Sequence, residues 1–215
     1  MPRTPLTRAA VLRAAMELAD ADGLPALSMR AVARALGVEA MSLYHHVANK
    51  DAMLDGMVDE VFAAFHLPEI GAPWRAELRT RSVSARAVLH RHPWAVGLMD
   101  SRRNAGYETV RHHDAVLGCL RESGFSWELA GSAFALLDAH LYGFLVQELA
   151  LPFEGEADLA ELAGAMFDAL PAGELPYFRG FATERALQPG YSFAPEFEIG
   201  LDLILDGLER RHLAQ

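Results

Sequence analysis

The feature that most constrains the fold is a pair of short helical segments separated by only three residues. The first segment, LSMRAVARALG, begins after Ser28 as the expected N-cap and ends at Gly37. Its apolar face consists of Met29, Val32, Ala33 and Leu36. The second segment, AMSLYHHV, follows directly after Gly37, Val38 and Glu39. Two short helices joined by such a turn fit a helix-turn-helix, and Val38 and Leu43 would complete its small core.

Helical periodicity continues along most of the remaining chain. Apolar positions recur at helical spacing over residues 7–23, 49–65, 75–92, 107–123, 126–150 and 195–212. We expect Thr7, Asn49 and Ser126 to cap three of these helices and Gly23 to end the first. The acidic stretch 150–195 is interrupted by Gly and Pro, and we interpret it as a variable region with one or two short helices. Since no strand-type alternation is present, the sequence predicts an all-α fold.

The charge distribution predicts a small head on a larger, acidic body. We place a three-helix, helix-turn-helix DNA-binding head at residues 1–48 and a helical-bundle body at residues 49–215. Residues 1–50 carry six basic and four acidic side chains, a balance of +2, whereas residues 51–215 carry 13 basic and 25 acidic ones, a balance of −12. Because the body would be repelled by DNA, contact with DNA is expected through the head alone.

The cysteine content and the hydropathy pattern predict a soluble, cytoplasmic protein. Cys119 is the single cysteine, so an internal disulfide is impossible and a reducing compartment is expected. The first 23 residues do not resemble a signal peptide because charged residues interrupt every apolar run. We find no run of about 18 apolar residues that could span a bilayer.

The segment LSMRAVARALGVEAMSLYHHVANKDAML resembles the DNA-binding head of the TetR (tetracycline repressor) family of bacterial transcriptional regulators. GV, SLY, HV and NK stand at that family's spacing. Downstream, LHRHPWAVGLM, YETVRHHDAVLGCLRESGFS, LYGFLVQELALP and EFEIGLDLILDGLERR are similar to the tetracycline-repressor-type C-terminal domain. The resemblance covers nearly the whole chain and is densest over residues 24–54.

A helix-turn-helix places its second helix in the major groove, where its N-terminal residues meet base edges. In this chain the base-reading candidates are Glu39, Ala40, Met41, Ser42 and His45. Contacts to phosphates supply most of the affinity. The resemblance implies that the DNA backbone is held by Ser28, Tyr44, His46 and Lys50, and that Arg30 reaches a base or a phosphate.

The resemblance also implies a homodimer that binds two half-sites of a palindromic operator, about one helical turn (~34–36 Å) apart. A small molecule bound in the body would tilt the helix that begins at Asn49, change the spacing of the heads and relieve repression. The expected dimer interface uses Leu136, Phe144, Leu201, Ile204, Leu205 and Leu208. The candidate ligand-binding side chains are Phe62, Phe65, His66, Trp94, Met99, His112, Leu137 and His140.

Other functions are less well supported by the sequence. It contains no G-x-S-x-G, P-loop, Rossmann glycine run, C-x-x-C or H-E-x-x-H, so we predict no catalytic site and no cofactor. His90, His92, His112 and His113 lack a convincing ligand spacing, so no functional metal is predicted. Arg81 and Leu98 stand near positions where the family's namesake uses an amide and a metal-binding imidazole, which argues against tetracycline as the ligand.

Two alternatives within the same architecture stay open. An activator would use the same DNA-binding head as a repressor. A helical interaction protein could retain the fold without binding DNA, but Tyr44, His46 and Lys50 argue against that loss.

Overall fold

The computed structural model describes residues 5–99, 101–102, 104–153, 155–171 and 174–214, and the regular elements in these ranges are all helical, which confirms the predicted fold class. In chain order they are α1 (Arg8–Ala26), α2 (Met29–Leu36), α3 (Ala40–Leu43), α4 (Lys50–Ala63), α5 (Trp74–Arg91), the 3₁₀ turn η1 (Pro93–Leu98), α6 (Tyr107–Glu122), α7 (Trp127–Leu149), α8 (Glu156–Ala169), α9 (Pro176–Phe181), the π-helical turn η2 (Ala182–Ala186) and α10 (Glu196–His212).

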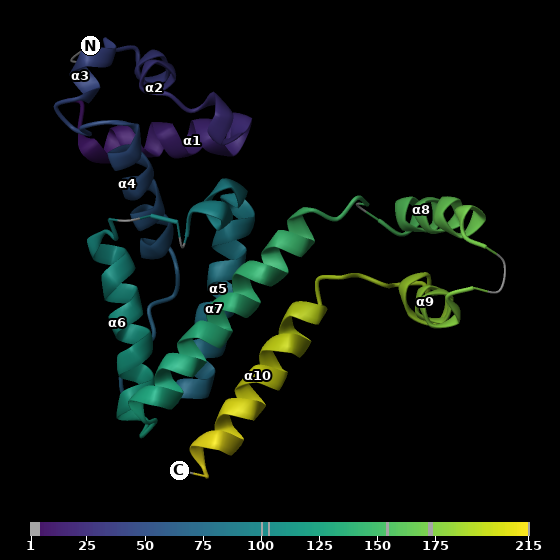
Figure 1. Ribbon diagram of the computed structural model, residues 1–215. Helices are drawn as coiled ribbons and strands as arrows, with labels where there is room; N and C mark the ends of the chain where they lie inside the picture. The colour runs from purple at the N-terminus through teal and green to yellow at the C-terminus, as the bar shows by residue number, and fades with distance from the viewer. Residues whose placement is uncertain (1–4, 100, 103, 154, 172–173, 215) are drawn as a thin grey trace.

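The head consists of α1, α2, α3 and the start of α4, at one end of the molecule (Figure 1). Thr7, Ser28 and Asn49 cap α1, α2 and α4, because each side-chain oxygen accepts a hydrogen bond from the backbone N–H three residues later, at 3.1, 3.1 and 2.8 Å. All three predicted caps are confirmed. Gly23 interrupts α1 with φ of 73°, as its predicted role as a helix end requires, and a last turn continues to Ala26.

The body is a bundle with α7 at its centre. α7 packs against α5, α6 and α10, and it runs antiparallel to α10 (Figure 1). Ser126 caps α7 by accepting a hydrogen bond from the N–H of Leu129 at 3.2 Å, as predicted. Among the described helices, α7 is the one that is long and apolar enough to cross a membrane. Half of its most apolar window is buried inside this chain, which is typical of a core helix.

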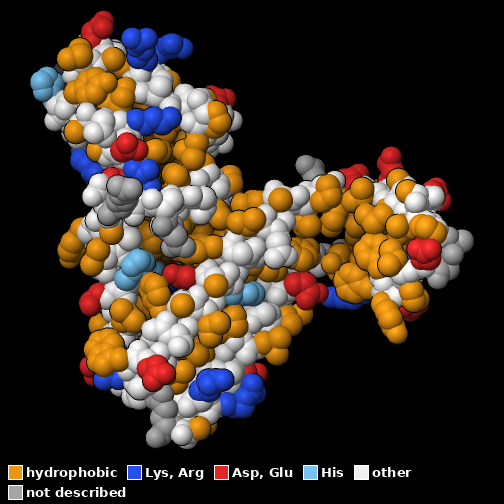
Figure 2. All heavy atoms as spheres, in the orientation of Figure 1, with side chains coloured by type: hydrophobic (Ala, Val, Ile, Leu, Met, Phe, Trp, Pro, Cys, Tyr) orange, Lys and Arg blue, Asp and Glu red, His pale blue; other side chains and the backbone are white. Residues whose placement is uncertain are grey.

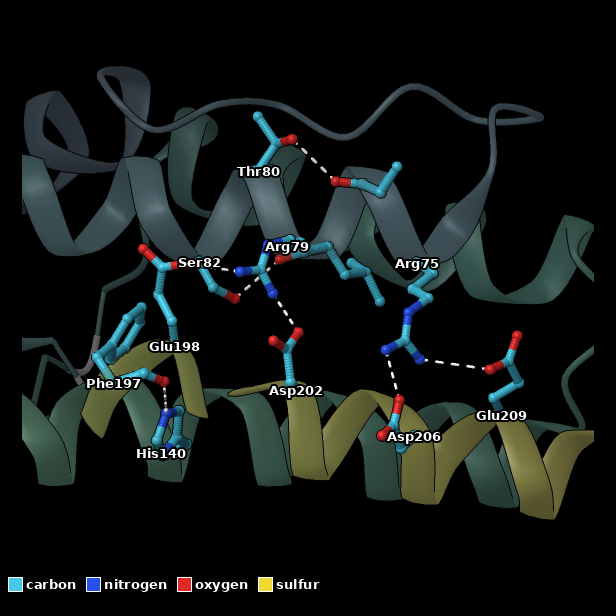
Figure 3. A network of polar contacts seen from close by, with 12 residues as sticks. Arg75, Arg79, Thr80, Ser82, His140, Phe197, Glu198, Asp202, Asp206 and Glu209 are labelled. Atoms are coloured by element: carbon cyan, nitrogen blue, oxygen red, sulfur yellow. Dashed lines mark hydrogen bonds and ion pairs between the residues drawn. The ribbon is translucent and has the colours of Figure 1, made fainter. Parts of the chain in front are cut away.

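A row of ion pairs joins α5 to α10 along one side of the body (Figure 3). The guanidinium of Arg75 lies 2.5 Å from a carboxylate oxygen of Asp206 and 3.4 Å from one of Glu209. One turn further along α5, Arg79 contacts Asp202 and lies 2.6 Å from Glu198. Since these side chains are partly exposed, each pair stabilises the fold by at most about 1 kcal/mol. The two arginines are one turn apart on α5, and each contacts two carboxylates on α10.

Between α7 and α10 the chain forms an arm, residues 151–193, that projects from the body (Figure 1). The sequence predicts one or two short helices here, but α8 extends over 14 residues and is followed by α9 and η2. The arm contains an open, apolar pocket of about 340 Å³. Its walls include Leu159, Leu162, Phe167, Phe178, Phe181 and Tyr191. Phe178 and Phe181 are also exposed on the outside, so the arm of a single chain leaves a large apolar surface uncovered.

Most of the side chains predicted for the dimer interface are buried within the single chain. Phe144, Leu201, Leu205 and Leu208 are all at least 92% buried within the single chain, so these side chains form its own core. Ile204 is partly buried against the same core. Leu136 remains on an exposed face, together with Val146 and Leu149 on α7 and Ile199 and Leu203 on α10. α10 is apolar on two faces, and the sequence pattern did not distinguish the face that meets α7 from the face that stays uncovered.

Candidate functional site

The turn between α2 and α3 depends on a left-handed glycine. Gly37 has φ of 64° and ψ of 36°, a conformation that costs other residues roughly 1 kcal/mol. The N–H of Gly37 donates to the carbonyl of Arg34 at 3.1 Å, and the N–H of Val38 donates to that of Ala33 at 3.0 Å. This hydrogen-bonded cap ends α2 and directs the chain into α3 within three residues.

The second helix of this motif buries one face and exposes the other. α3 spans Ala40–Leu43, and hydrogen bonds from the N–H groups of His46 and Val47 to the carbonyl of Leu43 extend it by another turn. Leu43 and Val47 are buried against α1 and α2. Met41 is 74% exposed and Tyr44 is 46% exposed, so the base-reading and phosphate candidates face outward. Glu39, Ala40, Ser42 and His45 are also exposed or half-buried.

Lys and Arg side chains also lie on the surface of the head (Figure 2). Arg30 on α2 and Lys50 at the first position of α4 are exposed, and no ion pair within the described part of the chain neutralises either of them. Ser28 uses its oxygen as the α2 cap, which leaves its O–H free to donate to a phosphate. His46 is half-buried. The head therefore carries Arg30 and Lys50 as exposed cations, together with several hydrogen-bond donors on and near α3.

The ligand candidates in the body separate into two groups. Phe62, Phe65 and His112 come together, with the ring of His112 at 5.5 and 5.6 Å from the two phenyl rings. Leu137 and Met99 are buried in the same core. The remaining three candidates hold parts of the fold together through hydrogen bonds: His66 to Glu77 at 2.7 Å, Trp94 to Asp20 at 2.6 Å, and His140 to the carbonyl of Phe197 at 2.9 Å.

A buried polar cluster adjoins the first group, and the sequence did not identify it as a site. Arg81 is 1% exposed, and its guanidinium donates to Asp138 at 2.6 Å and to Nε2 of His112 at 3.4 Å. Burial, with a smaller contribution from the Arg81 charge, lowers the pKa of His112 from 6.5 to about 3. The imidazole of His112 is therefore neutral at physiological pH. Over the described residues, no three His, Cys, Asp or Glu side chains are grouped as metal ligands would be.

One face of α4 is acidic and binds the start of α6. Asp59 accepts hydrogen bonds from the N–H and the hydroxyl of Thr109, at 2.8 and 3.0 Å, and so replaces the side-chain cap that Gly106 cannot supply. A Cβ at Gly106 would lie 2.1 Å from Asp59, so only glycine permits this approach. Asp55, one turn earlier, contacts Arg102 at 2.6 Å. The four-residue spacing of Asp51, Asp55 and Asp59 was visible in the sequence, but their loop partners were not.

Comparisons with known proteins agree with this geometry. Residues 11–57 match the family model for bacterial regulatory proteins of the tetR family, and residues 67–212 match the model for the tetracyclin repressor-like C-terminal domain. The HTH-type transcriptional repressor DrrR1 of Streptomyces coeruleorubidus is 32% identical, over 97% of this chain and 79% of its own length. The class A tetracycline repressor from transposon 1721 of Escherichia coli is also 32% identical, over 94% of this chain and 90% of its own length.

Solved structures give the same result for the fold. ActR of Streptomyces coelicolor, a TetR family protein crystallised with actinorhodin, superposes with a TM-score of 0.80 at 27% identity. The match covers 95% of this chain and 96% of ActR. This chain therefore belongs to the TetR family of DNA-binding transcriptional regulators and has a tetracycline-repressor-like C-terminal domain.

Proposed function

We propose that this regulator is a homodimeric repressor that a small molecule releases from a palindromic operator. The observation that carries the proposal is the outward face of α3, held on a rigid head whose α4 is tied to the body. The relatives named above are repressors, which favours repression over activation. No enzymatic role is proposed, and the family's soluble character fits a cytoplasmic location.

In this proposal the head divides DNA recognition between two sets of side chains. Tyr44, His46, Ser28 and Lys50 hold the phosphates, and Arg30 reaches a phosphate or a base edge. The sequence-reading set is Glu39, Ala40, Met41, Ser42 and His45. Met41 is the most exposed of the apolar side chains on α3, so it is well placed to contact a thymine methyl group. The domain boundary proposed at residue 48 assigns α4 to the body, although its first residue contacts DNA.

The second copy would cover the apolar surface that a single chain leaves open. On α7 the exposed positions include Gly131, Ala135, Ala139 and Gly143, each one turn apart, which allow a partner helix to approach closely. Leu136 on α7 and Leu203 on α10 supply larger apolar side chains, both more than half exposed. We place the interface there, on α7 and α10, where the two chains would form a four-helix bundle.

The acidic face of α4 supplies the coupling between ligand and DNA. Asp59 fixes the N-terminus of α6, and Asp55 fixes Arg102 in the preceding loop. A ligand that moves α6 against α7 would therefore move α4, and α4 begins in the head at Lys50. A second link joins the two parts, since Asp20 of α1 accepts hydrogen bonds from Trp94 and His92 at 2.6 and 2.8 Å.

We place the effector in the body, near Phe62, Phe65, His112 and Leu137, between α4, α6 and α7. Support comes from the way these candidates meet around a buried polar cluster and from the crystal structure of ActR with actinorhodin. His66, Trp94 and His140 have fixed hydrogen-bond partners, and these three and Met99 are secondary candidates. Apolar walls with a few polar groups are usual for small-molecule sites.

The operator would be identified by selecting duplexes that the purified protein retains from a random DNA pool. The proposal expects a two-fold symmetric consensus whose half-sites are centred about 10 base pairs apart, or a multiple of that spacing. Recovery of unrelated sequences after repeated selection in low salt, or of a single asymmetric half-site, would contradict it.

A further inference from the structure

The joint between α5 and η1 lies against α1 of the head. His92 ends α5, because its N–H donates to the carbonyl of Val88 at 3.1 Å and its carbonyl accepts from the N–H of Ala95 at 2.9 Å. Trp94, the second residue of η1, is 8% exposed and belongs to the core of the chain. The backbone that carries the rings of His92 and Trp94 is therefore held firmly by the body.

Both of these rings point a nitrogen at the same oxygen atom of the head. Oδ1 of Asp20, on α1, accepts a hydrogen bond from Nε1–H of Trp94 at 2.6 Å and one from Nδ1 of His92 at 2.8 Å. An indole nitrogen only donates and a carboxylate only accepts, so the direction of the Trp94 bond is fixed. Hydrogen bonds to a charged acceptor are among the stronger ones. This contact therefore ties α1 to the body at one defined point.

α1 is held at a second point, on α4. A Cβ added at Gly56 of α4 would lie 2.7 Å from the guanidinium of Arg8 and 2.8 Å from the side chain of Leu12, so the two helices approach closely there. Asp20 lies about two turns beyond Leu12, roughly 12 Å further along the helix axis. A helix held at a single point can pivot about it, whereas a helix held at two points cannot. The contact at Asp20 therefore removes a rotation that the contact with α4 leaves open.

A rotation of α1 would carry the exposed face of α3 with it. α2 packs on α1, and Leu43 of α3 is buried in the same core. On B-DNA, moving a half-site by one base pair displaces it by about 3.4 Å along the duplex and turns it by about 35° around the axis. Two heads of fixed orientation therefore match a single spacing of half-sites, whereas heads that pivot can follow a displaced half-site.

We propose that Asp20 is a positioning residue that determines which half-site spacing this regulator accepts. This rests on the proposed function, because spacing has a meaning only for a dimer on a palindromic operator. In this role Asp20 contacts neither a base nor a phosphate and acts through the orientation of α1. Selectivity among operators then has two separate sources, since α3 reads the sequence of a half-site and the joint at Asp20 determines the distance between half-sites.

Operators that share both half-sites and differ only in spacing test the inference. The selected operator is compared with two versions in which one central base pair is inserted or removed. Wild type should prefer the selected spacing by at least about tenfold, because each altered operator presents one half-site in the wrong orientation. Asp20→Ala and Trp94→Phe, which remove the acceptor and the indole donor, should reduce the preference to about twofold or less. Asp20→Asn should keep most of it, because the amide oxygen still accepts both hydrogen bonds.

Glu17→Ala is the matched control. Glu17 lies one turn before Asp20 on α1, is exposed and borders the same cleft beside His92. Its removal takes the same charge from the same side of the head without breaking the contact to Trp94, so the spacing preference should equal that of wild type. A variant that is merely less stable loses affinity for all three operators in the same proportion, which leaves the preference unchanged.

The indole N–H resonance of Trp94 in the DNA-free protein reports on the contact itself. It is assigned by its absence in Trp94→Phe and should shift upfield in Asp20→Ala. An unchanged resonance, a wild-type spacing preference in Asp20→Ala, or an equal loss of preference in Glu17→Ala overturns the inference. Equal wild-type affinity for the three spacings also overturns it. Equal wild-type affinity for the palindrome and for a single half-site would instead refute the proposed function.

Discussion

Single residues on the head explain how an acidic chain binds a polyanion. The phosphate candidates include the hydrogen-bond donors Tyr44 and His46 beside the cation Lys50. Hydrogen bonds from neutral groups position the head without raising its charge, whereas each cation adds affinity by releasing counterions. The two kinds of contact therefore have separable experimental signatures.

Lys50→Ala should weaken operator binding and reduce the slope of log K against log salt by about 1, because one phosphate contact is lost. Tyr44→Phe should weaken binding to all sequences alike and leave the salt slope unchanged. Titrations of each variant with the operator and with unrelated DNA, at several salt concentrations, measure both the affinity and the salt slope. Equal slopes for wild type and Lys50→Ala would show that Lys50 does not contact a phosphate.

Met41→Ala should change sequence preference instead of overall affinity. Its side chain is 74% exposed, so its removal leaves the fold of the head intact. We expect discrimination at one base pair of each half-site to fall, within the roughly 1–3 kcal/mol that a single mismatch costs. Affinities for a set of single-base operator variants measure this, and an equal loss on every variant would exclude base reading by Met41.

His112 makes stability depend on pH. Burial lowers the pKa of His112 from 6.5 to about 3. Between these two pH values, the imidazole is therefore protonated in the unfolded chain and neutral in the folded chain. The contribution of His112 to the free energy of unfolding is complete above pH 6.5 and is lost as the pH falls toward 3. In this range, the free energy of unfolding decreases by up to about 1.4 kcal/mol per pH unit. Urea unfolding at pH 7, 6 and 5 should show a steeper decline for wild type than for His112→Phe. Parallel declines would mean that His112 is not neutral in the fold.

At the scale of the helix, the proposed link between recognition and regulation is α4. Its N-cap Asn49 lies in the head, and its acidic face holds both the loop before α6 and the first turn of α6. Since Asp59 serves as the cap of a different helix, a shift of α6 cannot occur without breaking a charge-assisted hydrogen bond or moving α4.

Asp59→Ala should therefore reduce the stability of the fold and weaken the coupling between effector binding and operator binding. Loss of the cap should lower the free energy of unfolding by about 0.5–2 kcal/mol. The decrease in operator affinity caused by a saturating effector should also become smaller. Asp51→Ala is the matched control, because Asp51 is on the same face but reaches Arg102 only at 3.4 Å and from an exposed position. If the two variants behave alike, α4 is not coupled to α6 through Asp59.

The helices show what could be predicted from sequence and what could not. Caps at Thr7, Ser28, Asn49 and Ser126 were predictable because a cap depends on residues three positions apart. The Arg81–Asp138 ion pair was not predictable, because it joins residues that are 57 positions apart. Whether these two side chains meet depends on how α5 packs against α7. The face of α10 that packs on α7 could not be told from its exposed apolar face for a similar reason, because both apolar stripes fit the same helical period.

At the scale of the whole molecule, a single chain leaves two apolar surfaces uncovered, the face on α7 and α10 and the arm. Isolated monomers seldom expose patches of this kind. A second copy would cover the first surface and would set the distance between the two heads.

Leu203→Glu should convert the protein to monomers with weak operator affinity, because Leu203 is 67% exposed in the single chain and would be buried in the dimer. Far-ultraviolet circular dichroism should show an unchanged helix content. Leu201→Glu, two residues earlier and fully buried, should instead unfold the chain. Sedimentation equilibrium distinguishes the two outcomes, and a dimeric Leu203→Glu protein would place the interface elsewhere.

Operator recognition itself is tested most directly by titrating the purified dimer against the selected duplex and against a scrambled duplex of the same composition, at physiological salt and without effector. The account predicts a preference of at least about 10³-fold for the operator, the lower end of the range for specific regulators. Equal affinity for the two duplexes would contradict it.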